Sequence, residues 1–373
     1  MMKLLDAAFG RLASSIMSSP AKGRHVSPIR SILLIRPGGI GDAVLLAPVI
    51  HAIKNIHPCA DITVLAERRN TGVFELIPAV DTVLCYDQPG EFVRTLKNKF
   101  DVIIDTEQWH RLSAVVARII SAPLKIGYDT NERRRMFTHP VPYSHDDHES
   151  VSFAHLLEPM GISAVSVEMD APFLIVPHAV AGKAAGLLEP LRDEPFVAIF
   201  PGASILERQW GAERFRRVAE MVFAFGIRTV VVGGTEDRHQ GEGIIEGGLG
   251  LNLAGRTSLA ETAAVIQKSA LLLSGDSGVL HIAVGLGVPT VSLFGPGRAK
   301  KWAPQGDRHS VINKNLPCSP CTTFGTTPPC TIHARCMRDI TADEVANALT
   351  MLLTSVGAVS SRCCKRDRVE TKG

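Results

Sequence analysis

The sequence is poor in aromatic residues, in net charge and in long apolar runs. Phe, Trp and Tyr make up 5% of its 373 residues, and 40 basic residues are nearly balanced by 37 acidic ones. Nucleic-acid binding needs stacking platforms or a basic surface, so this composition argues against it. No apolar run reaches the roughly 18–20 residues of a membrane-spanning helix. The apolar residues instead form short runs, which are typical of buried strands in parallel sheets.

Cysteine is also sparse, and the start of the chain lacks a clear secretory signal. Eight cysteines do not make a disulfide scaffold in a chain of this length. Asp6 and Arg11 interrupt the first apolar stretch and no small-residue cleavage site follows, so we expect a cytoplasmic protein. Residues 1–27 still carry an apolar helical stripe beside Lys3 and Arg11. We expect this extension to lie as an amphipathic helix on a membrane surface, or to pack on the protein or remain loose.

What the sequence does contain is an alternation of apolar strands and helical stretches, which begins near residue 28 and restarts at residue 196. The expected strands are residues 31–35, 61–65, 81–85 and 101–105, and then residues 196–200, 229–232, 271–274 and 290–294. This order predicts an α/β fold with two domains built on parallel sheets. We place the first domain at 28–175, a proline-containing join at 176–195, the second domain at 196–356 and a basic tail at 357–373.

A glycine-rich turn, Pro37-Gly-Gly-Ile-Gly-Asp42, follows the first strand. Gly39 and Gly41 permit a tight turn and a close backbone approach before a helix. No Gly-Lys-[Ser/Thr] follows, so this is not a P-loop, and Val44 replaces the third glycine of a dinucleotide fingerprint. Asp42 stands at the start of the helix as either a cap or a general base, and the local sequence alone favours a cap.

A second motif, Gly275-Asp-Ser-Gly-Val-Leu-His281, also follows a buried strand and precedes a helix. Asp276, Ser277, Gly278 and the first free N–H groups of that helix would suit a diphosphate, because a helix start attracts anions. His281 lies one turn further on and would face the same ligand. The alternative is that Asp276 caps the helix and His281 is an ordinary buried histidine.

Two loops of the second half offer further ligand contacts. Ser204 and Arg208 follow the strand 196–200, and a guanidinium can bind two phosphate oxygens at once. Arg208 is otherwise a surface residue that pairs with an acidic neighbour. Glu236 or Asp237, after the strand 229–232, would accept hydrogen bonds from ribose or sugar hydroxyls, or belong to a solvated turn.

Four cysteines gather near the end of the second half, at Cys318, Cys321, Cys330 and Cys336. The first pair has the spacing of metal ligands. The later intervals are irregular for a zinc ribbon, so a structural metal, paired disulfides and free thiols are all open. A cytoplasmic location would disfavour stable disulfides.

Taken together, these motifs resemble those of the ADP-heptose:lipopolysaccharide heptosyltransferases, glycosyltransferase family 9. The resemblance rests on Arg36 to Asp42 with Pro48, on Pro201 to Trp210, on Gly275 to Gly297, and on the tail from Cys318 to Met337, and it covers roughly residues 30 to 350. It implies a GT-B fold, in which two Rossmann-like domains face each other across a cleft.

The resemblance also implies a metal-independent inverting transfer that requires no cofactor. The first domain would bind a lipid-linked oligosaccharide acceptor, whose hydroxyl Asp42 would deprotonate. The second domain would bind the nucleotide-sugar donor through Asp276 and His281, with Arg208 stabilising the departing diphosphate. Such an enzyme would work in the cytoplasm, on the inner face of the membrane.

Two features depart from the family pattern or stay open. Many members carry Lys where this chain has Arg208, which changes the hydrogen-bond geometry at the donor. Arg133 and Arg135 lie in an expected loop at 123–142, where they would meet acidic or phosphorylated sugars of the acceptor or simply face solvent.

The rival functions are an NAD-linked oxidoreductase that uses the first glycine turn and a non-catalytic nucleotide-sugar-binding protein.

Overall fold

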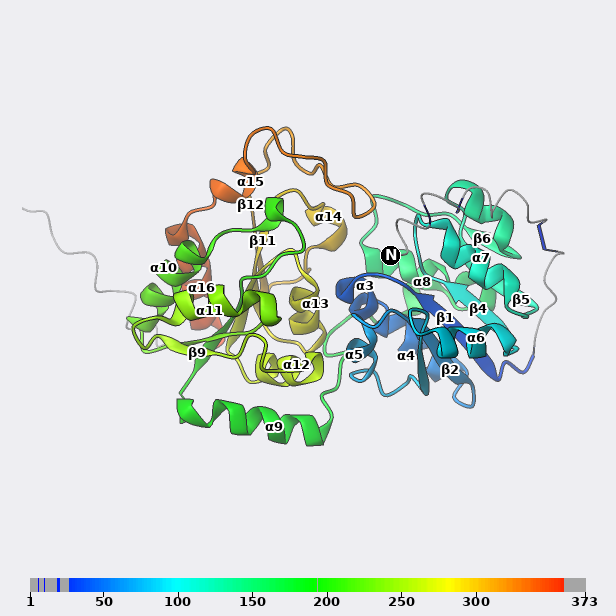
Figure 1. The fold of residues 1–373 in the computed structure, drawn as a ribbon, viewed down its shortest axis with the longest axis horizontal. Coiled ribbons are helices and arrows are strands. Elements are labelled where there is room, and N and C mark those ends of the chain that lie inside the picture. Colours follow the sequence, from blue (N-terminus) through cyan, green and yellow to red (C-terminus); the bar gives the residue numbers. More distant parts are fainter. Residues whose placement is uncertain (1–5, 7–9, 11–18, 21–26, 193, 359–373) are drawn as a thin grey trace, which may run out of the picture. The chain divides into compact units, whose positions relative to one another are not determined.

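The computed structural model describes Asp6, Gly10, Ser19, Pro20, residues 27–192 and residues 194–358. It divides into two compact units, Met1–Ile175 and Val176–Gly373, each with its own sheet (Figure 1). The amphipathic helix expected in residues 1–27 and nearly all of the expected basic tail lie outside the described residues. Within the described part of the chain, no helix combines the length and apolar character needed to cross a bilayer.

The first unit is a six-stranded parallel sheet in the order β3-β2-β1-β4-β5-β6. Its strands are β1 (Ser31–Arg36), β2 (Asp61–Ala66), β3 (Thr82–Cys85), β4 (Val102–Asp105), β5 (Leu124–Tyr128) and β6 (His139–Val141). Its α-helices are α3 (Ile40–Leu45), α4 (Ala47–Ile56), α5 (Thr71–Phe74), α6 (Pro89–Lys97), α7 (Arg111–Ile119) and α8 (Glu149–His155), and the 3-10 helices are η2 (Asn131–Met136), η3 (Glu158–Met160) and η4 (Ala164–Ser166).

The second unit repeats this strand order as β12-β11-β10-β7-β8-β9. Its strands are β7 (Phe196–Phe200), β8 (Arg228–Val231), β9 (Gly250–Asn252), β10 (Leu271–Gly275), β11 (Thr290–Phe294) and β12 (His309–Asn313). Its α-helices are α9 (His178–Leu188), α10 (Ala212–Phe223), α11 (Arg238–Ile245), α12 (Leu259–Gln267), α13 (Gly278–Gly285), α14 (Ala299–Trp302), α15 (Arg335–Arg338) and α16 (Ala342–Ser355), and the 3-10 helices are η5 (Glu189–Leu191), η6 (Leu206–Arg208) and η7 (Thr235–Asp237).

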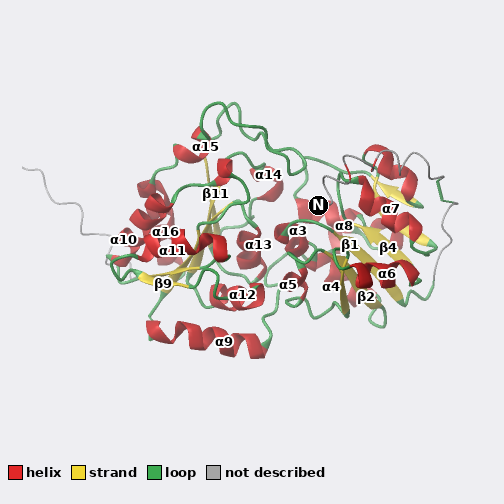
Figure 2. Cartoon of the chain, viewed as in Figure 1, coloured by secondary structure: helices red, strands yellow, loops and turns green. Residues whose placement is uncertain are grey.

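Both sheets are buried on both faces, which explains why their central strands are nearly all apolar. In β1, Leu33 and Ile35 pack toward the core that α6 and α7 cover, and the intervening residues are equally buried. In the second unit, α10, α11 and α16 lie on one side of the sheet and α12 and α13 on the other (Figure 1). Residues 176–195, expected to join the domains, contain α9, which packs against α12 of the second unit (Figure 2).

The loop expected at residues 123–142 is wrong, because this segment contains β5, η2 and β6. Lys125 and Gly127 obscured the strand pattern of β5. The Lys125 ammonium is tied by hydrogen bonds to the carbonyls of Arg118 and Ile120, so its charge is satisfied inside the unit. The Phe137 ring lies where a side chain at position 127 would stand, so glycine is required for that packing.

The same segment corrects the expectation for Arg133. Its guanidinium is fully buried and lies 2.9 Å from Asp105, which is also fully buried at the end of β4. Ser113 donates to Asp105 and accepts from Arg133, so the pair is enclosed by hydrogen bonds. Arg133 therefore faces the interior of the unit and not an acceptor, whereas Arg134 and Arg135 are exposed.

One described residue of the N-terminal extension has a defined place. The Asp6 carboxylate is buried and accepts hydrogen bonds from the N–H groups of Arg111 and Leu112, at 2.6 and 2.7 Å. These N–H groups begin α7 and have no partner within that helix, so Asp6 supplies the cap that the local sequence lacks.

Removing Arg133 should destabilise the first unit strongly. The Arg133→Ala variant leaves Asp105 buried without its cation, which typically costs about 3–5 kcal/mol. The matched Arg134→Ala variant removes an exposed arginine and should change stability by less than about 0.5 kcal/mol. Urea unfolding followed by circular dichroism compares the two, and equal midpoints would show that the buried pair has no such role.

Candidate active site

The first unit presents its candidate residues where β1 and β4 lie side by side and the strand order changes direction. In open parallel sheets, ligands bind outside the carboxyl ends of the strands at this point. Gly38 follows β1 with a φ of 103°, a backbone conformation that favours glycine. Gly39 is the N-cap of α3 without a side-chain cap bond, and Gly41 and Asp42 stand within the first turn. Asp42 is thus not the N-cap residue.

Asp42 lies among charged groups from three loops. Its side chain is 20% exposed, and its Oδ2 lies 3.6 Å from Nη2 of Arg36. The same nitrogen lies 3.4 Å from Oε2 of Glu107, in the loop after β4. Burial raises the pKa of Asp42 above its ordinary value, the Arg36 guanidinium opposes this most strongly, and Glu107 adds to the rise. Arg69, in the loop after β2, is a second and more exposed cation that favours ionised Asp42.

Sequence reasoning missed a second layer of polar residues in this unit. Glu149, at the start of α8, is buried and accepts hydrogen bonds from Gln108 and from the hydroxyl of Tyr143, at 2.5 and 2.9 Å. Glu107 had a usable signal, because it follows the apolar strand 101–105 by two residues and so belongs to the same sheet edge. Glu149 had none, because it follows no predicted strand and its partner Gln108 lies 41 positions away.

The second unit gathers its candidates at the matching edge of its own sheet. Asp276 follows β10, and its Oδ2 lies 3.2 Å from Nη1 of Arg208. Burial raises the pKa of Asp276, and Arg208 opposes the rise. The Nε of Arg208 is buried and has no hydrogen-bond partner among the described residues. An anion bound at the start of α13 would find this Nε without a partner.

Ser277 and His281, both expected to contact the donor, have structural contacts within the second unit. The Ser277 hydroxyl caps α13 by accepting from the N–H of Leu280, and it also contacts the hydroxyl of Ser274. His281 is 4% exposed, and its ring meets that of Trp302 edge to face at 6.4 Å. The structure therefore gives Ser277 a helix-capping role and His281 a buried position within α13.

The loops after β7 and β8 meet through a buried carboxylate. Asp237 accepts a hydrogen bond from the N–H of Gly234 at 2.9 Å and leaves no room for a side chain at Gly202. Glu236 and Ser204 are both exposed on these loops. Asp237 thus shapes the turn. Ser204 and Glu236 lie at the surface of the same edge, where Glu236 accepts a hydrogen bond from the Thr235 hydroxyl.

The four clustered cysteines lie near one another as free thiols. Burial raises the pKa of Cys336, and the thiols of Cys321, Cys330 and Cys318 add to the rise. Among the residues that the structure describes, no three His, Cys, Asp or Glu side chains are arranged to hold a metal ion. Cys336 also packs against Gly295, so the cluster adjoins the loop after β11.

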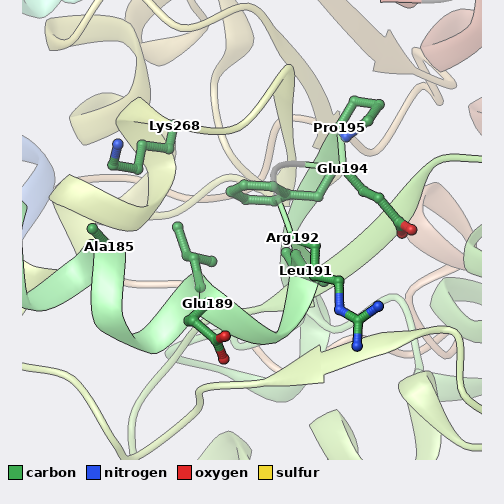
Figure 3. Close-up of a pocket in the computed structure, with 9 residues that line it drawn as sticks. Ala185, Glu189, Leu191, Arg192, Glu194, Pro195 and Lys268 are labelled. Carbon is green, nitrogen blue, oxygen red and sulfur yellow. The ribbon is translucent and has the colours of Figure 1, made fainter.

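A separate pocket lies at the amino end of β7, and none of the predicted donor residues line it (Figure 3). It is formed by the end of α9, the following turn and α12, with the side chains of Ala185, Leu188, Glu189, Leu191, Arg192, Glu194, Pro195, Phe196 and Lys268. Because β7 delivers Ser204 and Arg208 from its other end, this pocket is distinct from the candidate donor edge.

The chain is similar to known heptosyltransferases in sequence and in fold. The profile of glycosyltransferase family 9 (heptosyltransferase) matches residues 90–331. Lipopolysaccharide heptosyltransferase 3 of Escherichia coli is 26% identical over 289 residues, which are 71% of this chain and 83% of that protein.

Two solved structures share the fold. The family 9 glycosyl transferase of Veillonella parvula matches with a TM-score of 0.75 at 20% identity, over 90% of this chain and 100% of that one. Heptosyltransferase WaaC of E. coli, solved with ADP-2-deoxy-2-fluoro heptose, matches with a TM-score of 0.68 at 16% identity, over 86% of this chain and 99% of that one. These likenesses confirm the predicted GT-B fold.

A side chain at Gly297 should disturb the donor edge. A Cβ there would collide with the Asp276 carboxylate, so Gly297→Ala must displace Asp276 from Arg208. Overpacking of this kind costs roughly 1–3 kcal/mol of stability, and the displaced Asp276 should also raise the dissociation constant for ADP. The control is Gly243→Ala, where a Cβ meets nothing within 4 Å. Equal ADP affinities by isothermal titration calorimetry would remove Asp276 from the site.

Proposed function

The chain belongs to glycosyltransferase family 9 and is therefore a glycosyltransferase; we propose that it moves a heptose from an ADP-activated donor to a lipopolysaccharide core, with inversion at the anomeric carbon and with Asp42 as general base. Membership of the family sets aside the two alternatives, an NAD-linked oxidoreductase and a non-catalytic binding protein. The heptose and the core acceptor are supported by the names of the relatives, which are lipopolysaccharide heptosyltransferases.

The observation that carries the mechanism is the environment of Asp42. Its carboxylate is partly exposed at the ligand-binding edge of the first sheet, and burial raises its pKa. A carboxylate with a raised pKa is a stronger base than an ordinary aspartate. Asp42 takes the proton of the acceptor hydroxyl while that oxygen forms its bond to the anomeric carbon. The bond from that carbon to the diphosphate oxygen breaks on the opposite side, which inverts the configuration.

The leaving diphosphate needs positive charge, and the second unit offers it. Arg208 has an unsatisfied buried Nε beside Asp276, and the N–H groups at the start of α13 point to the same edge. Fixed donors of this kind stabilise charge as it develops in the transition state. Exposed Glu236 and Ser204 stand at the neighbouring strand ends, where they can bind hydroxyls of the donor. The E. coli structure solved with an ADP-heptose analogue supports this donor class.

On the acceptor side we propose a lipid-linked oligosaccharide, reached by the protein as a peripheral enzyme on the cytoplasmic face of the membrane. Exposed Arg134 and Arg135 on η2 provide the basic charge that acidic sugars or anionic headgroups would meet. Arg133 is not part of this surface, because it is buried against Asp105.

Replacing Asp42 by asparagine should abolish most of the turnover while leaving the fold intact. Loss of a general base costs about 10²–10⁴-fold in rate. The assay measures ADP released from ADP-heptose with truncated lipopolysaccharide as acceptor. The matched variant Asp61→Asn changes an exposed carboxylate at the other end of a strand and should keep wild-type turnover. Near-normal turnover of a folded Asp42→Asn protein would overturn the base assignment.

Replacing Arg208 by glutamine should weaken donor binding. Charge-assisted hydrogen bonds contribute roughly 1.5–3 kcal/mol, so the dissociation constant for ADP should rise about 10- to 150-fold. Arg208→Lys keeps the charge and should lose less affinity. Arg217→Gln, which removes an exposed arginine of α10, is the control. Unchanged ADP affinity in Arg208→Gln would place the diphosphate elsewhere.

A further inference from the structure

Arg36 is a buried guanidinium at the junction of the two loops that frame the base. It ends β1, and its side chain is 1% exposed. Its Nε donates to the carbonyl of Pro37 at 2.8 Å, and its Nη1 donates to the carbonyl of Thr106 at 2.9 Å. One acceptor belongs to the loop after β1 and the other to the loop after β4. Arg36 therefore fastens these loops together where the strand order changes direction.

The third guanidinium nitrogen of Arg36, Nη2, lies close to two carboxylates. Nη2 lies 3.6 Å from Oδ2 of Asp42 and 3.4 Å from Oε2 of Glu107. Glu107 is fixed in turn, because its Oε1 accepts from the N–H groups of Trp109 and His110 at 3.1 and 3.2 Å. With two of its nitrogens committed to the backbone, the guanidinium cannot follow a moving carboxylate, so it sets where that carboxylate rests.

A third loop is tied to the same point. Asn70, after β2, is fully buried, and its side-chain nitrogen donates to the carbonyls of Arg36 and Gly38 at 3.1 and 3.3 Å. Its side-chain oxygen accepts from the N–H of Glu67 at 3.0 Å. The backbone from Arg36 to Gly38 thus has ties that do not involve the Arg36 side chain. A change to the guanidinium removes its bonds to the carbonyls of Pro37 and Thr106 as well as its contacts with Asp42 and Glu107.

We propose that Arg36 is the positioning residue of the catalytic base: it fixes the Asp42 carboxylate against the loops after β1 and β4, and it shares its charge between Asp42 and Glu107. The inference rests on the proposed role of Asp42. Arg36 itself has no route to the acceptor, because its side chain is buried.

Removing Arg36 and removing Glu107 should then shift the pKa of Asp42 in opposite directions. The charged or titratable groups facing Asp42 are Arg36, Arg69, Glu107 and Tyr143. Arg36 lowers the pKa of Asp42 and Glu107 raises it. Losing the cation favours protonated Asp42, so the acid limb of kcat/KM moves to higher pH. Losing the neighbouring carboxylate favours ionised Asp42, so the limb moves to lower pH.

The experiment compares Arg36→Gln, Arg36→Lys, Glu107→Gln and Arg69→Gln with the wild type, in pH profiles of ADP release from ADP-heptose with truncated lipopolysaccharide. A second readout needs no substrate: carbon-13 NMR of protein labelled at the Asp carboxyl carbons, with the Asp42 signal identified by its loss in Asp42→Asn. Removing an opposite charge at this distance shifts a carboxyl pKa by about one unit or more.

We expect the pKa of Asp42 to rise by about one unit or more in Arg36→Gln and to fall in Glu107→Gln. In Arg36→Lys it should stay near the wild-type value. Arg69→Gln should give a smaller rise, because the Arg69 side chain is 56% exposed and screened by solvent.

The inference would be overturned if the pKa of Asp42 stayed unchanged in both Arg36→Gln and Glu107→Gln. It would also be overturned if the two variants shifted this pKa in the same direction. Should Arg36→Gln fail to fold, the fall in Glu107→Gln and the rescue by Arg36→Lys decide it. The proposed function fails separately: active Asp42→Asn removes the base, whereas inactive Asp42→Asn with unmoved titrations removes only the role of Arg36.

Discussion

The constraint on which the candidate site depends is the point in each sheet where the strand order changes direction. Between β1 and β4 in the first unit, and between β7 and β10 in the second, neighbouring parallel strands send their loops to opposite sides. The loops part there, so within each unit side chains from segments distant in sequence can face the same ligand. Asp42, Glu107, Arg208 and Asp276 all follow one of these four strands. The rest of each unit, two buried faces of sheet under helices, keeps these strand ends in place.

Around these points the charges occur in pairs that join separate loops. A carboxylate inside a protein is costly unless a cation and hydrogen bonds accompany it. Arg36 pairs with Asp42 and Glu107, Arg208 pairs with Asp276, and Arg133 pairs with Asp105. The pairs differ in accessibility, and this separates their roles. Asp105 and Arg133 are enclosed and hold the unit together, whereas Asp42 keeps part of its side chain exposed and is available to a substrate.

Local sequence predicted those parts of the fold and site whose causes are local. Short apolar runs located eight of the strands, and glycine turns after two of them located Asp42 and Asp276. It missed β5, because Lys125 is satisfied by carbonyls that only the folded chain supplies. It took Arg133 for a surface residue, since its partner Asp105 lies 28 positions away. Glu149 had no local signal. Ser277 was expected to bind a diphosphate at the start of α13, and in the structure its hydroxyl caps that helix.

We propose that this protein joins a heptose to a lipopolysaccharide core with inversion. The most direct test is the structure of the product formed from ADP-heptose and truncated lipopolysaccharide. Mass spectrometry should find the acceptor enlarged by a single heptose for each ADP released, and NMR should find the anomeric configuration opposite to that of the donor. Release of ADP without an enlarged acceptor, or a product with the donor's configuration, would contradict the account.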